Sequence, residues 1–133
     1  MTFGPISSHK VGLWSKSEVL RFQSSEKAFS TTASGITDCG DIEIQVVGLD
    51  EFLGGQDITI IKMDPPGNII PEVLKGAAQT ISRCKPKMVL NAYNTFEDIF
   101  EIPHLVHSLW PDYRLHLRHV SWTVSETDLF ACL

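Results

Sequence analysis

The stretch Asp57–Gly76, DITIIKMDPPGNIIPEVLKG, decides the fold of this chain. It holds a mostly apolar run, Ile58–Met63, which is interrupted by Lys62, ends at Asp64 and is followed by a Pro-Pro-Gly turn. A run this short, closed by two prolines, favours a buried strand over a helix. Because α/β folds bind ligands at the carboxyl ends of their strands, we expect this strand to carry the Asp64 carboxylate to a ligand-binding rim.

Length and composition predict one globular domain. The chain has 133 residues, of which 43% are hydrophobic and 20% are charged. These values are ordinary for a globular protein, and a chain of this length buries roughly two-thirds of its unfolded surface. We expect a single domain over residues 1–133, with a hairpin, loop and strand region at 1–56 and a β-α-β-α-β-β core at 57–133.

Charge and cysteine usage narrow the function classes. The net charge of −5 gives no basic face for nucleic acid. No apolar run approaches the roughly 20 residues that cross a membrane, and the N-terminus lacks the pattern of a secretory signal. Cys39, Cys84 and Cys132 are odd in number and form no CxxC pair. We therefore expect a cytoplasmic protein without structural zinc.

The region before the deciding stretch predicts short strands and a long connection. Val11–Phe22 has two apolar runs around a Ser-Lys-Ser turn, which predicts a β-hairpin. The polar segment Gln23–Gly40 is longer than a usual connection and is interpreted as a flexible loop or a functional flap. Apolar residues alternate over Ile42–Val46, which predicts a half-buried strand. A short helical turn is expected at Leu49–Leu53, before two glycines.

Two helices are expected after the deciding stretch. Pro71 suits the first position of a helix. The apolar residues of Val73–Ile81 have the spacing of one helix face and predict a single helix that ends near Arg83. A second apolar face runs over Phe96–Leu109, and Pro103 is expected to divide it into a turn and a main helix.

Three further strands complete the pattern, at Met88–Tyr93, Tyr113–Leu117 and Leu129–Leu133. Strands that alternate with helices imply parallel pairing with right-handed crossovers. The last two strands are joined by a short connection, and we expect them to be antiparallel. The predicted fold class is therefore α/β, with parallel strands and crossover helices closed by an antiparallel C-terminal hairpin.

Four segments, in this order and spacing, resemble a known family. ITIIKMD, EVLKGA, KPKMVLNAY and PDYRLHLRH are similar to the C-terminal half of FkbM-type methyltransferases. The resemblance implies a partial Rossmann-like methyltransferase sheet. It also implies methyl transfer from S-adenosylmethionine to a hydroxyl of a small molecule, often a sugar or a natural product.

The chain departs from this family in two ways. The family has an acid two positions after the strand-ending Asp, and Pro66 stands there in this sequence. The family also carries its cofactor on an N-terminal half with a Gly-rich turn between a strand and a helix, and no such turn occurs here. We therefore expect a chain that binds no S-adenosylmethionine by itself and is inactive in isolation. The alternative is a degenerate, non-catalytic copy that acts as an interaction or oligomerisation module.

Five residues are candidates for the site. Asp64, Tyr93 and His119 are the catalytic candidates, and Asn94 and Arg118 are the substrate-binding candidates. Tyr93 and Asn94 follow a strand that should end at the same rim as Asp64. Asn94 stands where the family often has His, and an amide cannot serve as a base. The simpler interpretations are a turn-capping Asp, an aromatic at the core edge, and a surface Arg-His pair.

The sequence Asp64-Pro-Pro-Gly67 also resembles the D-P-P-Y motif of amino-group methyltransferases. In that motif the Asp and a proline carbonyl accept hydrogen bonds from the target amine, and the aromatic ring stacks on the substrate. Gly67 supplies no ring, so we interpret the match as chance.

Histidines and aromatic residues offer weaker alternatives. A metal-dependent hydrolase could use the four C-terminal histidines, but His104 and His107 lack an evident third ligand, and His116 and His119 fall on opposite faces of a strand. No metal site is therefore predicted. The aromatic side chains expected to pack at the core and rim are Phe96, Phe100, Trp110 and Trp122.

The strand at Ile58–Met63 is expected to lie at an open sheet edge. In the full fold it would pair with a strand of the missing N-terminal half. Here the edge stays exposed unless Val11–Phe22, Ile42–Val46 or a second copy pairs with it. Exposed apolar edges invite association, so we predict self-association or a partner.

Overall fold

Two four-stranded sheets and four helices make up the part of the chain that the computed structural model describes, residues 4–23, 35–36, 40–122 and 126–133. In spatial order the first sheet holds β1 (Gly12–Trp14), β4 (Ile42–Gly48), β2 (Glu18–Gln23) and β3 (Gly35–Ile36), and the second holds β5 (Ile60–Met63), β6 (Lys87–Asn91), β8 (Thr127–Cys132) and β7 (Arg114–His119). The helices are α1 (Leu49–Leu53), α2 (Ile70–Lys75), α3 (Ala78–Cys84) and α4 (Asp98–Leu109). Within these residues, no helix is long and apolar enough to cross a membrane. Cys39 and most of the predicted loop Gln23–Gly40 fall outside them.

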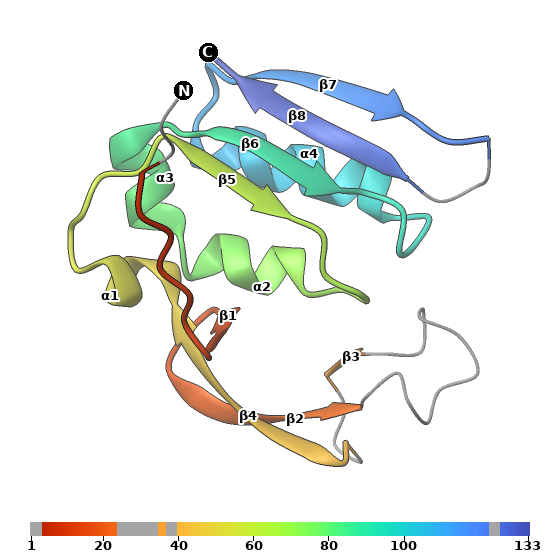
Figure 1. The fold of residues 1–133 in the computed structure, drawn as a ribbon. Coiled ribbons are helices and arrows are strands. Elements are labelled where there is room, and N and C mark those ends of the chain that lie inside the picture. Colours follow the sequence, from red (N-terminus) through yellow and green to blue (C-terminus); the bar gives the residue numbers. More distant parts are fainter. Residues whose placement is uncertain (1–3, 24–34, 37–39, 123–125) are drawn as a thin grey trace.

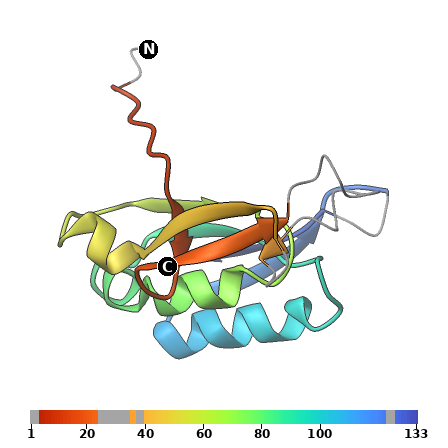
Figure 2. The ribbon, with the colours of Figure 1, turned by 90° about the horizontal axis from the view of Figure 1, so that it is seen from below.

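The second sheet has the predicted mixture of pairings. β5 and β6 are parallel, and β7 and β8 form the expected antiparallel pair. β8 lies between β6 and β7, antiparallel to both, so the Rossmann-like parallel arrangement is confined to one pair of strands. The helices α2, α3 and α4 cover one face of this sheet (Figures 1 and 2). The side chains at the centre of that layer are fully buried, and each stabilises the fold by about 1.5–3 kcal/mol; they include Leu74, Ile81, Leu90, Ile102, Val106 and Leu129.

The first sheet corrects the predicted hairpin. The two apolar runs of Val11–Phe22 are strands, but β1 and β2 do not pair with each other. β4 lies between them, parallel to β1 and antiparallel to β2, and both Gly12 and Glu18 are in register with Val46. This arrangement gives β4 a partner on each edge and buries Val46, whereas a hairpin would leave one edge of β4 unpaired. The predicted strand Ile42–Val46 and the helical turn Leu49–Leu53 are confirmed as β4 and α1.

The predicted single helix after Pro71 is divided into α2 and α3. The division falls at Gly76, whose backbone packs against the first sheet. A β-carbon at Gly76 would overlap the carbonyl oxygen of Trp14 and lie 3.1 Å from the Cα of Gly48. Gly76 therefore stands where two segments of backbone touch, and a continuous helix with a side chain at this position would not fit.

Asp50 joins α1 to α3. Its carboxylate accepts hydrogen bonds from the backbone N–H groups of Gln79 (3.0 Å) and Thr80 (2.7 Å), in the first turn of α3. The N–H of Asp50 itself donates to the carbonyl of Gly76 at 2.8 Å. A carboxylate that binds the free N–H groups of a helix start does the work of an N-cap, and here it comes from a distant part of the chain.

Pro103 does not divide the second predicted helix. α4 runs without a break from Asp98 to Leu109 with Pro103 inside it. Pro103 is the sixth of the twelve residues of α4, so its ring removes one backbone hydrogen bond from the middle of the helix. Ile102 and Val106, before and after it, are buried in the core, and this packing favours a continuous helix. The start is held by Asp98, whose buried carboxylate accepts hydrogen bonds from the N–H and the hydroxyl of Thr95.

We expect the substitution Gly76→Ala to lower the free energy of unfolding by about 3 kcal/mol, because the added carbon forces the two backbone segments apart. Gly4→Ala is the matched control, since a β-carbon at Gly4 meets no atom within 4 Å. Urea unfolding followed by circular dichroism measures both. Equal stability of the two variants would contradict the tight contact at Gly76.

Candidate functional site

The turn after β5 is held in place by two asparagine side chains. The Nδ2 groups of Asn91 and Asn94 both donate to the carbonyl of Pro65, each at 3.1 Å, and Asn94 also donates to the carbonyl of Gly67 at 3.0 Å. Gly67 has φ +69°, a conformation that favours glycine. The Pro-Pro-Gly turn is therefore fixed against the carboxyl end of β6.

Asp64, Tyr93 and Lys62 form a hydrogen-bonded group at the same rim. The Tyr93 hydroxyl donates to Oδ1 of Asp64 at 2.9 Å, and Lys62 Nζ lies 3.2 Å from Oδ2. The hydrogen bond from Tyr93, and after it the neighbouring Lys62, hold the pKa of Asp64 below its ordinary value of 3.8 although partial burial opposes them. Burial, with the Asp64 carboxylate next, raises the pKa of Tyr93.

These pKa directions decide what the group can do. At neutral pH Asp64 is ionised, and each of its oxygens faces a donor, so it is a weak proton acceptor. Tyr93 is protonated and its proton is directed at Asp64. The arrangement fits orientation of a polar substrate group better than removal of a proton from it.

The match to the D-P-P-Y motif finds no support in this geometry. A carbonyl oxygen has two lone pairs and can accept two hydrogen bonds. The Pro65 carbonyl already accepts two, one from Asn91 and one from Asn94. A target amine would have to displace one of these side chains.

The remaining two candidates lie farther along the sheet. Arg118 and His119 end β7, and β8 separates them from β6. Two strand spacings put β7 about 10 Å from β6. Arg118 is in register with Asp128, while His119 Nδ1 is 2.9 Å from the hydroxyl of Thr127, on the opposite face of the sheet. The structure thus brings Asp64, Tyr93 and Asn94 together, and Arg118 and His119 are not part of that cluster.

Sequence reasoning missed Asn91. Its side chain is 1% exposed, and its Oδ1 is the one buried side-chain polar atom without a partner among the described residues. Asn91 directly follows the apolar residues of β6. A polar residue at the end of a buried strand is the sequence feature that could have identified it.

Three aromatic predictions are wrong. Phe96 and Phe100, expected to pack in the core and at the rim, are 76% and 63% exposed and contact each other edge to face at 5.9 Å. Trp122 is also exposed. The helix predicted within Phe96–Leu109 is present as α4, but Phe100 lies on the solvent-exposed side of this helix.

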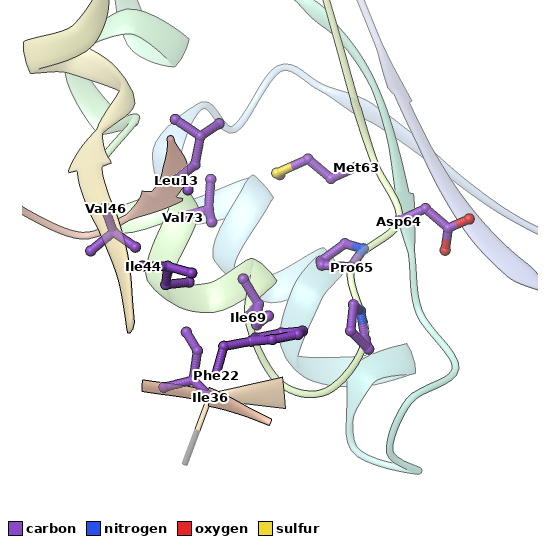
Figure 3. Close-up of a pocket in the computed structure, with 12 residues that line it drawn as sticks. Leu13, Phe22, Ile36, Ile44, Val46, Met63, Asp64, Pro65, Ile69 and Val73 are labelled. Atoms are coloured by element: carbon purple, nitrogen blue, oxygen red, sulfur yellow. The ribbon is translucent and has the colours of Figure 1, made fainter. Parts of the chain in front are cut away.

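A hollow of about 440 Å³ lies beside the rim, between the first sheet and the start of α2. Figure 3 shows Leu13 and Ile44 on one side and Met63 and Pro65 on the other, with Phe22 and Ile69 next to each other between them. Asp64 also borders the hollow, but its carboxylate points away from the apolar side chains.

The carboxyl ends of the parallel strands β5 and β6 carry polar side chains, and this is the edge at which α/β folds generally bind ligands. A family model described as the methyltransferase FkbM domain matches residues 4–120, and the chain belongs to this family. Family membership implies S-adenosylmethionine-dependent chemistry.

A solved structure agrees with this assignment. The chain is similar to the crystal structure of methyltransferase FkbM from Methylobacillus flagellatus KT, with a TM-score of 0.71 and 27% identity. The similarity covers 93% of this chain and 28% of that chain, so this sequence spans less than a third of that protein. No curated protein matches significantly.

We expect Tyr93→Phe to raise the pKa of Asp64 towards its ordinary value of 3.8, because the largest stabilisation of the carboxylate is removed. Lys62→Met should raise it less. A lowered carboxyl pKa adds stability above about pH 4 that is lost as pH falls through the folded-state value, so this part of the pH dependence should shrink in Tyr93→Phe. Carboxyl-carbon NMR titration measures the shift, and an unchanged pKa in Tyr93→Phe would contradict the hydrogen bond.

Proposed function

We propose that this chain is the acceptor-binding portion of an FkbM-type methyltransferase, which transfers a methyl group from S-adenosylmethionine to a hydroxyl of a small molecule. The observation that carries the proposal is the cluster of Asp64, Tyr93 and Asn94 at one rim of a domain of this family. In this proposal Asp64 and Tyr93 orient the hydroxyl, and catalysis is mostly positioning.

The residues of this chain do not by themselves fit the methyl donor. The junction of β4 and α1 carries Gly48, where even an added β-carbon would lie only 3.3 Å from the carbonyl oxygen of Gly76. At the junction of β5 and α2, the Pro65 carbonyl already accepts hydrogen bonds from Asn91 and Asn94. Neither junction has the Gly-rich turn that lets a cofactor approach the backbone. We therefore propose that the isolated chain binds no S-adenosylmethionine and is inactive.

An odd number of cysteines without a CxxC pair favours a cytoplasmic protein.

Isothermal titration of the chain with S-adenosylmethionine tests this. The expected result is the absence of saturable heat, with an established S-adenosylmethionine-binding enzyme titrated in the same buffer as the positive control. A dissociation constant in the micromolar range would overturn the proposed inactivity of the isolated chain.

The second candidate function is a non-catalytic interaction module. β5 pairs with β6 on one edge, and no described strand pairs with its other edge. Ile60 on this strand is 63% exposed. The shortness of β5 and the charge of Lys62 are features that weaken edge-to-edge pairing, so the proposed partner, a second copy or the remaining part of a longer methyltransferase, would bind weakly.

We expect the average mass of the chain in light scattering to rise with concentration, and Ile60→Lys to suppress this rise by placing a charge on the open edge. Phe100→Lys is the matched control, because Phe100 is equally exposed but lies on α4. A monodisperse monomer at high concentration, or equal suppression by both variants, would count against association through β5.

A further inference from the structure

We propose that the hollow beside the rim is a binding site for an uncharged, mainly apolar small molecule. Its walls come from both sheets and from α2, and Val46 and Val73 are buried in it. Other lining side chains, among them Leu13, Phe22 and Ile69, are only half-buried. An apolar occupant would remove their remaining surface from water, which is the main driving force for such binding.

The size of the hollow favours a small molecule over a peptide. An α-helix is about 10–12 Å across and rises 5.4 Å per turn, so two turns fill on the order of 1,000 Å³. The hollow holds about 440 Å³. Ligand sites typically have roughly 300–1,000 Å³ and are lined mostly by apolar side chains.

The lining also determines the charge of the ligand. Asp64 is the one charged residue among those described that border the hollow, and its carboxylate is turned outward to Tyr93 and Lys62. An anion would find no donor side chain among these lining residues, and a buried charge without a partner is costly. Neutral molecules are therefore preferred over their acidic analogues.

Asp64 both borders the hollow and belongs to the cluster that we propose binds the acceptor hydroxyl. A molecule with its apolar body in the hollow would have its polar end at this rim. We infer that the methyl acceptor is an alcohol with an apolar body, a statement that rests on the proposed function. Binding itself does not depend on methyl transfer.

The test uses the neutral fluorescent probe N-phenyl-1-naphthylamine and the chain without cofactor. We expect saturable binding of one probe per chain, which 1-decanol displaces and decanoate displaces at least about tenfold less well. Ile44→Trp and Ile69→Trp each fill the hollow from a half-buried position and should weaken probe binding by about tenfold or more. Phe96→Ala, on a surface away from the hollow, is the control, and circular dichroism checks that each variant is folded.

Four outcomes would overturn the inference. Probe binding could fail to saturate or persist unchanged in both filled variants that fold. Decanoate could compete as well as 1-decanol, which would exclude a site for neutral ligands. Probe binding could also weaken in step with self-association, which would assign the hollow to a second copy. The probe experiment contains no S-adenosylmethionine, so its result does not depend on the methyltransferase proposal. Likewise, a failure to bind the probe would not change the result of the titration with S-adenosylmethionine.

Discussion

The hydrogen bonds from the backbone of α3 to the Asp50 carboxylate are the interaction on which the rest of the structure depends. Among the residues that the structure describes, the two sheets share no ladder of backbone hydrogen bonds. They are held together by this carboxylate and by the contact of Gly48 with Gly76, where the absence of side chains lets the backbones meet. Both features lie at the junction of α1, α2 and α3. They fix how far the first sheet stands from α2, and this spacing is what leaves a hollow between them.

The sequence predicts those features that depend on neighbouring residues. The strand ending at Asp64, the start of α2 near Pro71 and the antiparallel pair β7 and β8 follow from apolar runs and turn residues, and all are present. The hairpin at Val11–Phe22 fails because strand pairing is decided by distant segments, and β4 competes successfully for both edges. The break at Gly76 is likewise caused by a contact with Trp14 and Gly48, which helical periodicity does not register.

The candidate site divides in the same way. Asp64, Tyr93 and Asn94 could be placed at one rim because parallel strands bring their carboxyl ends together. Arg118 and His119 could not be placed from sequence, since the insertion of β8 between β6 and β7 is a property of the whole sheet. The role of Asn91 could not be predicted for another reason. Its side-chain amide donates to a backbone carbonyl, and because every residue has such a carbonyl, the sequence does not indicate which one is the acceptor. The hollow, built from residues of five strands and a helix, was equally invisible.

The clamp on the turn after β5 has a consequence for how the protein responds to its surroundings. Asn94 holds the carbonyls of Pro65 and Gly67 through an amide that carries no charge at any physiological pH. A histidine at this position, as the family resemblance would suggest, changes its charge and its donors between about pH 5 and 8. With asparagine, the shape of the turn is uncoupled from acidification. The wall that Pro65 gives to the hollow is therefore the same in an acidic and in a neutral environment.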